Sequence, residues 1–77
     1  MPDVHDTILQ VLEPYVSRPI ASTYVRATAV TLRKTSDKLE YGDLGALETG
    51  LREMLQPVAS RQLIDETILE IRERLRV

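Results

Sequence analysis

The chain has 77 residues, a net charge of −2 and no cysteine. This length makes one small domain, close to the lower limit at which a single hydrophobic core sustains a fold. The lack of cysteine excludes disulfide bonds, thiolate metal sites and a cysteine nucleophile. The negative net charge gives the whole chain no general attraction to nucleic acid or to an anionic membrane.

The composition predicts an aliphatic core, because three Tyr are the only aromatic residues among 43% hydrophobic residues. Such a core in so short a chain is marginally stable, which favours a homodimer or a partner that hides further apolar surface. The first residues show no basic segment before an apolar run, so we expect no signal peptide. No stretch approaches the roughly 20 apolar residues that span a bilayer, and we expect a cytoplasmic protein without a membrane partner.

The first half of the chain predicts two helices. Asp3 is a favourable N-cap for a helix over residues 4–13, which must end before Pro14 because proline disfavours helical geometry in the preceding residue. Ser17 caps a second helix over 18–35, in which Pro19 occupies the first turn. The residues at helical spacing that predict its buried side are Ile20, Tyr24, Ala27, Thr28, Thr31 and Leu32.

The second half predicts two more helices, over residues 41–55 and 61–75. The third has a leucine stripe that is interrupted by Gly45 and Gly50, and either glycine can permit the close approach of another helix. Ser60 caps the fourth helix, whose apolar stripe consists of Ile64, Ile68, Ile71 and Leu75. The predicted fold is therefore all-α, a small four-helix domain built from two helical hairpins.

A short pattern occurs twice along the chain. The sequence L-x-P-x-x-S-R covers residues 12–18 and again residues 55–61, an offset of 43 residues, and apolar positions on both sides follow the same offset. A repeated pattern of this kind predicts two similar units, each with a helix, a proline-marked corner and a second helix. Four shared identities also arise by chance, so a duplication and a coincidence remain equal alternatives.

Residues 12–21, with the pattern L-x-P-Y-V-x-x-P-I-A, resemble short helical modules of bacterial regulatory proteins. The resemblance covers ten residues of apolar pattern and identifies no functional residue. It implies a regulatory role for a small bacterial protein. The size and acidity of the chain also invite comparison with acyl carrier proteins, but residues 42–45 read Gly-Asp-Leu-Gly and lack the serine that such proteins need for their prosthetic arm.

No constellation in the sequence predicts catalysis. His5, the only histidine, stands beside Asp6 as a phosphoacceptor would, but it lies in the first turn of a helix, where a solvated side chain is the expected state. A single histidine does not make a zinc site. The acidic residues of the last helix alternate with arginines, which predicts a solvated, ion-paired surface such as Glu70 with Arg74. We expect neither an enzyme nor a metal or cofactor site.

The most distinctive charge pattern is a loose stripe of Arg18, Arg26 and Arg33 on the second helix. This stripe can contact an acidic partner, or it can be a solvated face that balances the acidic helices. As a partner for this stripe, an acidic protein surface is favoured over nucleic acid, because no aromatic stacking platform accompanies the arginines.

The sequence therefore predicts a non-enzymatic interaction or regulatory module that acts through self-association or a protein partner. The alternative is a nucleic-acid-binding regulator that uses the basic stripe. The candidate contact residues are the three arginines together with four hydrophobic anchors: Tyr24, Ile68, Ile71 and Leu75.

Overall fold

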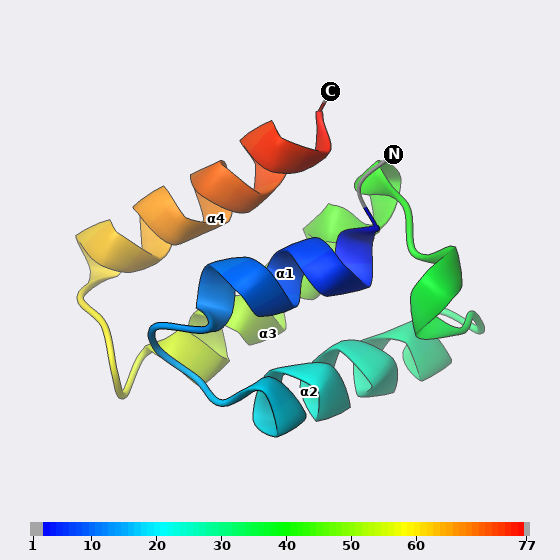
Figure 1. The fold of residues 1–77 in the computed structure, drawn as a ribbon, viewed down its shortest axis with the longest axis horizontal. Helices are drawn as coiled ribbons and strands as arrows, with labels where there is room; N and C mark the ends of the chain where they lie inside the picture. Colours follow the sequence, from blue (N-terminus) through cyan, green and yellow to red (C-terminus); the bar gives the residue numbers. More distant parts are fainter. Residues whose placement is uncertain (1–2, 77) are drawn as a thin grey trace.

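The computed structural model describes residues 3–76 and confirms the all-α class. Its four α-helices are α1 (Val4–Leu12), α2 (Arg18–Thr31), α3 (Leu44–Leu55) and α4 (Arg61–Leu75), and two short 3-10 turns, η1 (Ser36–Lys38) and η2 (Tyr41–Asp43), connect α2 to α3. Helix α1 packs against α2 and α4, and α3 packs against the same two helices. As a result α2 and α4 lie along opposite edges of the molecule (Figure 1).

The core is aliphatic, as the composition requires. Side chains from all four helices and from the connection between α2 and α3 contribute to it, and the most deeply buried large ones are Ile8, Leu12, Val25, Leu47, Leu51, Leu55 and Ile71. Helix α1 is the most enclosed: six of its nine residues are buried, and α2, α4 and the η1 turn all contact it. The only charged or polar residues buried among residues 3–76 are Thr7 and Thr67.

Helix α2 ends at Thr31, four residues before the end expected from the sequence. The Lys34 N–H donates to the Ala29 carbonyl and the Arg33 N–H donates to the Val30 carbonyl, which is the hydrogen-bond pattern of a Schellman cap. Such a cap requires a left-handed residue, and Arg33 supplies it at φ 60°. Glycine usually holds this position. Because an arginine holds it here, no glycine in the sequence marks the end of the helix.

The buried side of α2 also differs from the prediction. Ala21, Val25 and Ala29 are buried, whereas Ile20 is 58% exposed and Ala27 and Thr31 are exposed. The other three residues of the expected side, Tyr24, Thr28 and Leu32, are half-buried. The observed face is therefore rotated by roughly a quarter turn from the expected one. The alanines explain the difference: their small side chains let the backbone of α2 lie close to its neighbours, and a pattern that weights large apolar residues overlooks them.

The two proline-marked corners have the same backbone hydrogen bonds. In the first, the Tyr15 and Val16 N–H groups both donate to the Leu12 carbonyl; in the second, those of Val58 and Ala59 donate to the Leu55 carbonyl. Ser17 and Ser60 both adopt extended N-cap geometry. Their side chains differ, since the Ser60 hydroxyl accepts from the Leu63 N–H at 3.2 Å and the Ser17 hydroxyl makes no cap hydrogen bond.

Of the two glycines in α3, only Gly50 allows a close helix approach. A methyl group at Gly50 would overlap the ring and hydroxyl of Tyr24 from α2, whereas one at Gly45 would meet nothing within 4 Å. The Tyr24 hydroxyl donates to the Leu47 carbonyl at 3.4 Å. Tyr24 is thus a half-buried residue that holds α2 against α3.

Candidate interaction surface

The solvent-facing side of α2 carries an apolar strip without charge. Ile20, Thr23, Ala27 and Val30 recur at intervals of three and four residues, so they lie on one side of the helix, and all four are exposed. Val30 is 72% exposed, the largest exposed fraction among the large hydrophobic residues of the described chain, and Ile20 is 58% exposed. We call these four residues the α2 outer face.

Of the three arginines that the sequence singled out, Arg26 and Arg33 lie beside the Val30 end of this face, whereas Arg18, two residues before Ile20, lies on another side of α2. Arg18, Arg26 and Arg33 are all exposed, and within residues 3–76 none of them has a carboxylate oxygen within 4.0 Å. Arg18 begins α2, Arg26 lies one turn before Val30, and Arg33 follows the end of the helix. Their charges are therefore available to an acidic group from outside this part of the chain.

Lys34, which follows Arg33, is by contrast occupied. Its ammonium group donates to Asp43 at 2.8 Å, and Asp43 also accepts from the Glu40 N–H at 2.9 Å. These contacts lower the pKa of Asp43 and raise the pKa of Lys34. The pair joins the end of α2 to the start of α3, so we assign Lys34 to the fold.

The predicted hydrophobic anchors lie inside the molecule or at its edge. Ile68 and Ile71 belong to the core at 5% and 1% exposure, while Tyr24 and Leu75 are partly buried against it. The isoleucine stripe of α4 thus closes the core of one copy of the chain. The sequence prediction did not include Val30 of α2 or Leu69 of α4, which are exposed large aliphatic residues, as Ile20 is. For Val30 a signal was available, because residues 20, 23, 27 and 30 are spaced by three and four positions.

The groove between α3 and α4 is ionic. Arg52 donates to Glu48, at 3.3 Å, and to Asp65, and Arg72 donates to the other Glu48 oxygen at 3.2 Å. These carboxylates raise the pKa of Arg52 above its usual value. Farther along α4, Glu70 and Arg74 form the expected pair at 2.7 Å. The network joins two helices, and each charge in it has a partner.

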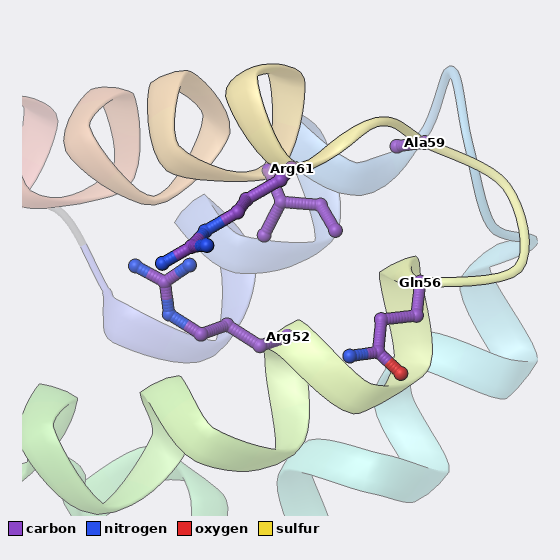
Figure 2. A pocket seen from close by; sticks show the side chains of 5 residues that line it. Arg52, Gln56, Ala59 and Arg61 are labelled. Atoms are coloured by element: carbon purple, nitrogen blue, oxygen red, sulfur yellow. The ribbon is translucent and has the colours of Figure 1, made fainter.

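A cavity of about 500 Å³ lies beside this network at the second corner, lined by Arg52, Gln56, Ala59, Arg61 and Ile64. Figure 2 shows the two guanidinium groups together on one side of the cavity and the Gln56 amide on another. Two arginines and an amide have the chemistry of a small-anion site. Because Glu48 and Asp65 already bind Arg52, an anion would have to displace them, and we assign no ligand to this cavity.

His5 has a structural contact rather than the solvated state expected from its position. Its side chain is 17% exposed. One ring nitrogen lies 3.1 Å from the Ser22 hydroxyl of α2, and the other lies 3.3 Å from Asp6. His5 therefore joins α1 to α2. In the described part of the chain, no three His, Asp or Glu side chains come together closely enough to hold a metal ion.

The outer face of α4 is the acidic counterpart of the α2 outer face. Gln62, Glu66, Leu69 and Glu73 recur at intervals of four, three and four residues, and all are exposed. Leu69 is 54% exposed at the centre of this row. We call these four residues the α4 outer face. Neither Glu66 nor Glu73 has a cationic nitrogen within 4.0 Å in residues 3–76.

Comparisons with known proteins add no assignment, because no protein-family model matches the chain and no curated protein or solved structure is significantly similar to it. Among the helices of residues 3–76, none combines the length and the apolar character that crossing a bilayer requires.

Proposed function

We propose that the chain is a non-enzymatic interaction module that acts through self-association, with the α2 outer face as its contact surface. One observation carries the proposal: Val30 and Ile20, two of the most exposed large aliphatic side chains of the described residues, lie on the same side of one helix with only Thr23 and Ala27 between them. A protein interface is typically an apolar centre with a charged rim, and Arg26 and Arg33 supply charge beside this centre.

The burial of this strip provides the driving force. Covering a large aliphatic side chain contributes about 1.5–3 kcal/mol when it is fully removed from water, and Val30 and Ile20 still expose more than half of their surface. Thr23 and Ala27 are short, so a second helix can approach the backbone of α2 between them. The three-and-four spacing of the strip is also the spacing at which helices pack against each other in coiled coils.

The test is the mass of the purified chain as a function of concentration, measured by light scattering. We expect the mass to rise above 8.8 kDa with concentration, and Val30→Asp to return it to the monomer mass. Val58→Asp is the control, because Val58 is also exposed, at 54%, but lies in the second corner. A wild-type chain that stays monomeric, or a Val30→Asp variant that associates like wild type, would overturn the proposal.

The alternative function, a nucleic-acid-binding regulator, is supported by the three arginines without carboxylate partners. If it is correct, the chain binds duplex DNA with an affinity that falls steeply with salt, because each phosphate contact releases counterions. Arg26→Ala with Arg33→Ala should then reduce both the affinity and its salt slope. Retention of wild-type DNA affinity in this variant, or an absence of DNA binding at low salt, would rule the alternative out.

A further inference from the structure

We infer that self-association is head to tail: the α2 outer face of one copy binds the α4 outer face of the next copy, with the two helices antiparallel. This inference rests on the proposed function and identifies the occupant of the Val30 end of its contact surface; in the register below, Ile20 lies beyond the last residue of α4. On α2 it uses Val30 of the outer face together with the two neighbouring cations, Arg26 and Arg33. On α4 it uses Leu69 together with the two anions Glu66 and Glu73.

The register follows from the spacing of these residues. On α2, Val30 comes four residues after Arg26 and three before Arg33; on α4, Leu69 comes four residues before Glu73 and three after Glu66. Running the helices in opposite directions therefore places Arg26 opposite Glu73 and Val30 opposite Leu69, and it brings Arg33, just past the end of α2, toward Glu66. On α4, Glu66 and Glu73 are seven positions apart, about 10 Å along the helix axis. On α2 the helix ends at Thr31, so the match of helical spacing covers Arg26 with Glu73 and Val30 with Leu69, and Arg33 adds its charge from the cap.

Exposure and charge agree with this pairing. Val30 is 72% exposed and Leu69 is 54% exposed, and the four charged residues beside them are exposed. Within residues 3–76, none of these four has an oppositely charged side chain within 4.0 Å. Arg33 lies just beyond the last turn of α2 and is itself the left-handed residue of the cap. Each copy thus offers one cationic and one anionic surface of matching pattern.

Two copies of the same face would not pair in this way. An antiparallel pair of α2 helices would bring Arg26 and Arg33 of one copy close to the same cations of the other, and a pair of α4 helices would bring together Glu66 and Glu73. Opposed like charges are destabilising and select against such arrangements. Charge complementarity therefore favours the mixed contact between α2 and α4 over either symmetric one.

The position of the two faces determines the kind of assembly. Because α2 and α4 lie along opposite edges of the molecule (Figure 1), a copy whose α2 outer face is covered still presents its α4 outer face on the other side. Contacts between two different faces are heterologous and extend into chains or close into rings. We therefore expect species larger than a dimer at high concentration, and weaker association at high salt, because exposed ion pairs are screened.

The decisive experiment blocks each face separately and then mixes the two variants. Val30→Asp blocks the α2 outer face and Leu69→Asp blocks the α4 outer face, both at exposed positions that leave the core intact. In sedimentation velocity, each variant alone should remain a monomer at concentrations where wild type forms larger species. An equimolar mixture should form a complex of two chains that does not grow further, because each variant retains the face that the other lacks. Val58→Asp should assemble like wild type.

The outcomes separate this inference from the proposed function. If Val30→Asp is monomeric but Leu69→Asp assembles like wild type, the α2 outer face is an interface and the head-to-tail contact is wrong. The same conclusion follows if the two blocked variants fail to combine. If neither substitution changes the assembly, both the inference and the proposed function are wrong.

A charge exchange tests the register. Arg26→Glu and Glu73→Arg should each weaken association by about tenfold or more, and the double variant R26E/E73R should recover most of the loss because every contact in the assembly then has the reversed pair. The mismatched double variant R26E/E66R serves as the control and should remain weak. Equal recovery in both double variants would show that net charge, and not the antiparallel register, controls the association.

Discussion

The two halves of the molecule share a corner and differ in the groove beside it. Residues 12–18 and 55–61 make the same turn with equivalent backbone hydrogen bonds. The positions occupied by Glu48, Arg52, Asp65 and Arg72 in the second half correspond, at an offset of 43 residues, to His5, Leu9, Ser22 and Ala29 in the first. One groove therefore holds an ion network, and the other holds buried aliphatic side chains with one hydrogen bond between His5 and Ser22.

This difference follows from how far each helix is enclosed. Six of the nine residues of α1 are buried, against four of the twelve residues of α3, and Leu9 is only 4% exposed. Arg52, at the matching position of α3, has a side chain that is 39% exposed. A charge at the enclosed position would be costly to desolvate, whereas at the exposed position it can stay hydrated. The shape of the corner depends on local backbone geometry. The type of residue in each groove depends on whether the rest of the chain buries that position or leaves it exposed to water.

The largest expected effect tests whether the two halves share one core. Val25 and Ile68 are matching positions and are 0% and 5% exposed. Val25→Asp and Ile68→Asp should both unfold the chain, because an unpaired buried carboxylate costs several kcal/mol in a domain with roughly 0.05–0.15 kcal/mol of stability per residue. Circular dichroism melting measures this. If one variant stayed folded, the second helices of the two halves would not be equivalent in the core.

A second comparison uses the two glycines of α3. Gly45→Ala should raise the free energy of unfolding by about 0.5–1 kcal/mol, since alanine is the better helix former. Gly50→Ala should instead lower it by about 1–3 kcal/mol, because the new methyl group must displace the Tyr24 ring from between α2 and α3. Urea denaturation of the two variants measures the difference. A stabilised Gly50→Ala variant would show that Tyr24 moves away freely.

The sequence predicted the elements better than the faces. Capping residues and Pro14 placed α1, α3 and α4 to within a few residues because these signals are local. The face of α2 was wrong in part: Tyr24 and Leu32 do pack against the core, but its fully buried residues are two alanines and a valine that were not selected. The end of α2 was missed for a related reason: Arg33 holds a left-handed position that glycine usually marks.

The candidate surface was predictable in part. The exposed arginines were found from charge alone, because a stripe of cations without interleaved acids has few partners within its own helix. Leu69 was not found, since an isolated apolar residue in a helix gives no sign of whether it points inward. Val30 was missed because Ile20 and Ala27, which share its side of the helix, were assigned to the buried face. Their exposure depends on the rotation of α2 and α4 against the core, and that rotation is a tertiary property.

The corners provide a third comparison, between Ser17 and Ser60. Ser60→Ala should cost about 0.5–2 kcal/mol, the usual loss for an N-cap whose hydroxyl accepts a backbone hydrogen bond. Ser17→Ala should cost clearly less, because the Ser17 hydroxyl makes no such bond and Pro19 already favours the start of the helix. Thermal melts of the two variants measure which serine contributes more to stability. Equal losses would mean that the two serines cap their helices alike in solution.

The smallest expected effect concerns the grooves. Arg52→Leu places in the second half the residue type found at the matching position of the first, and it removes the contacts to Glu48 and Asp65. Ion pairs that are this exposed contribute little to stability, and leucine recovers part of the loss by covering apolar surface. We therefore expect a small destabilisation at low salt that decreases as salt screens the wild-type network.

Chemical denaturation with urea at two salt concentrations measures this difference without adding a charged denaturant. The matched control is Arg74→Leu, which removes the exposed pair with Glu70 on a single helix and should change stability by a few tenths of a kcal/mol. A loss in Arg52→Leu of several kcal/mol at both salt concentrations would contradict the comparison. In that case the ion network would hold α3 to α4 as firmly as the aliphatic groove holds α1 to α2, and the two halves would differ in chemistry but not in strength.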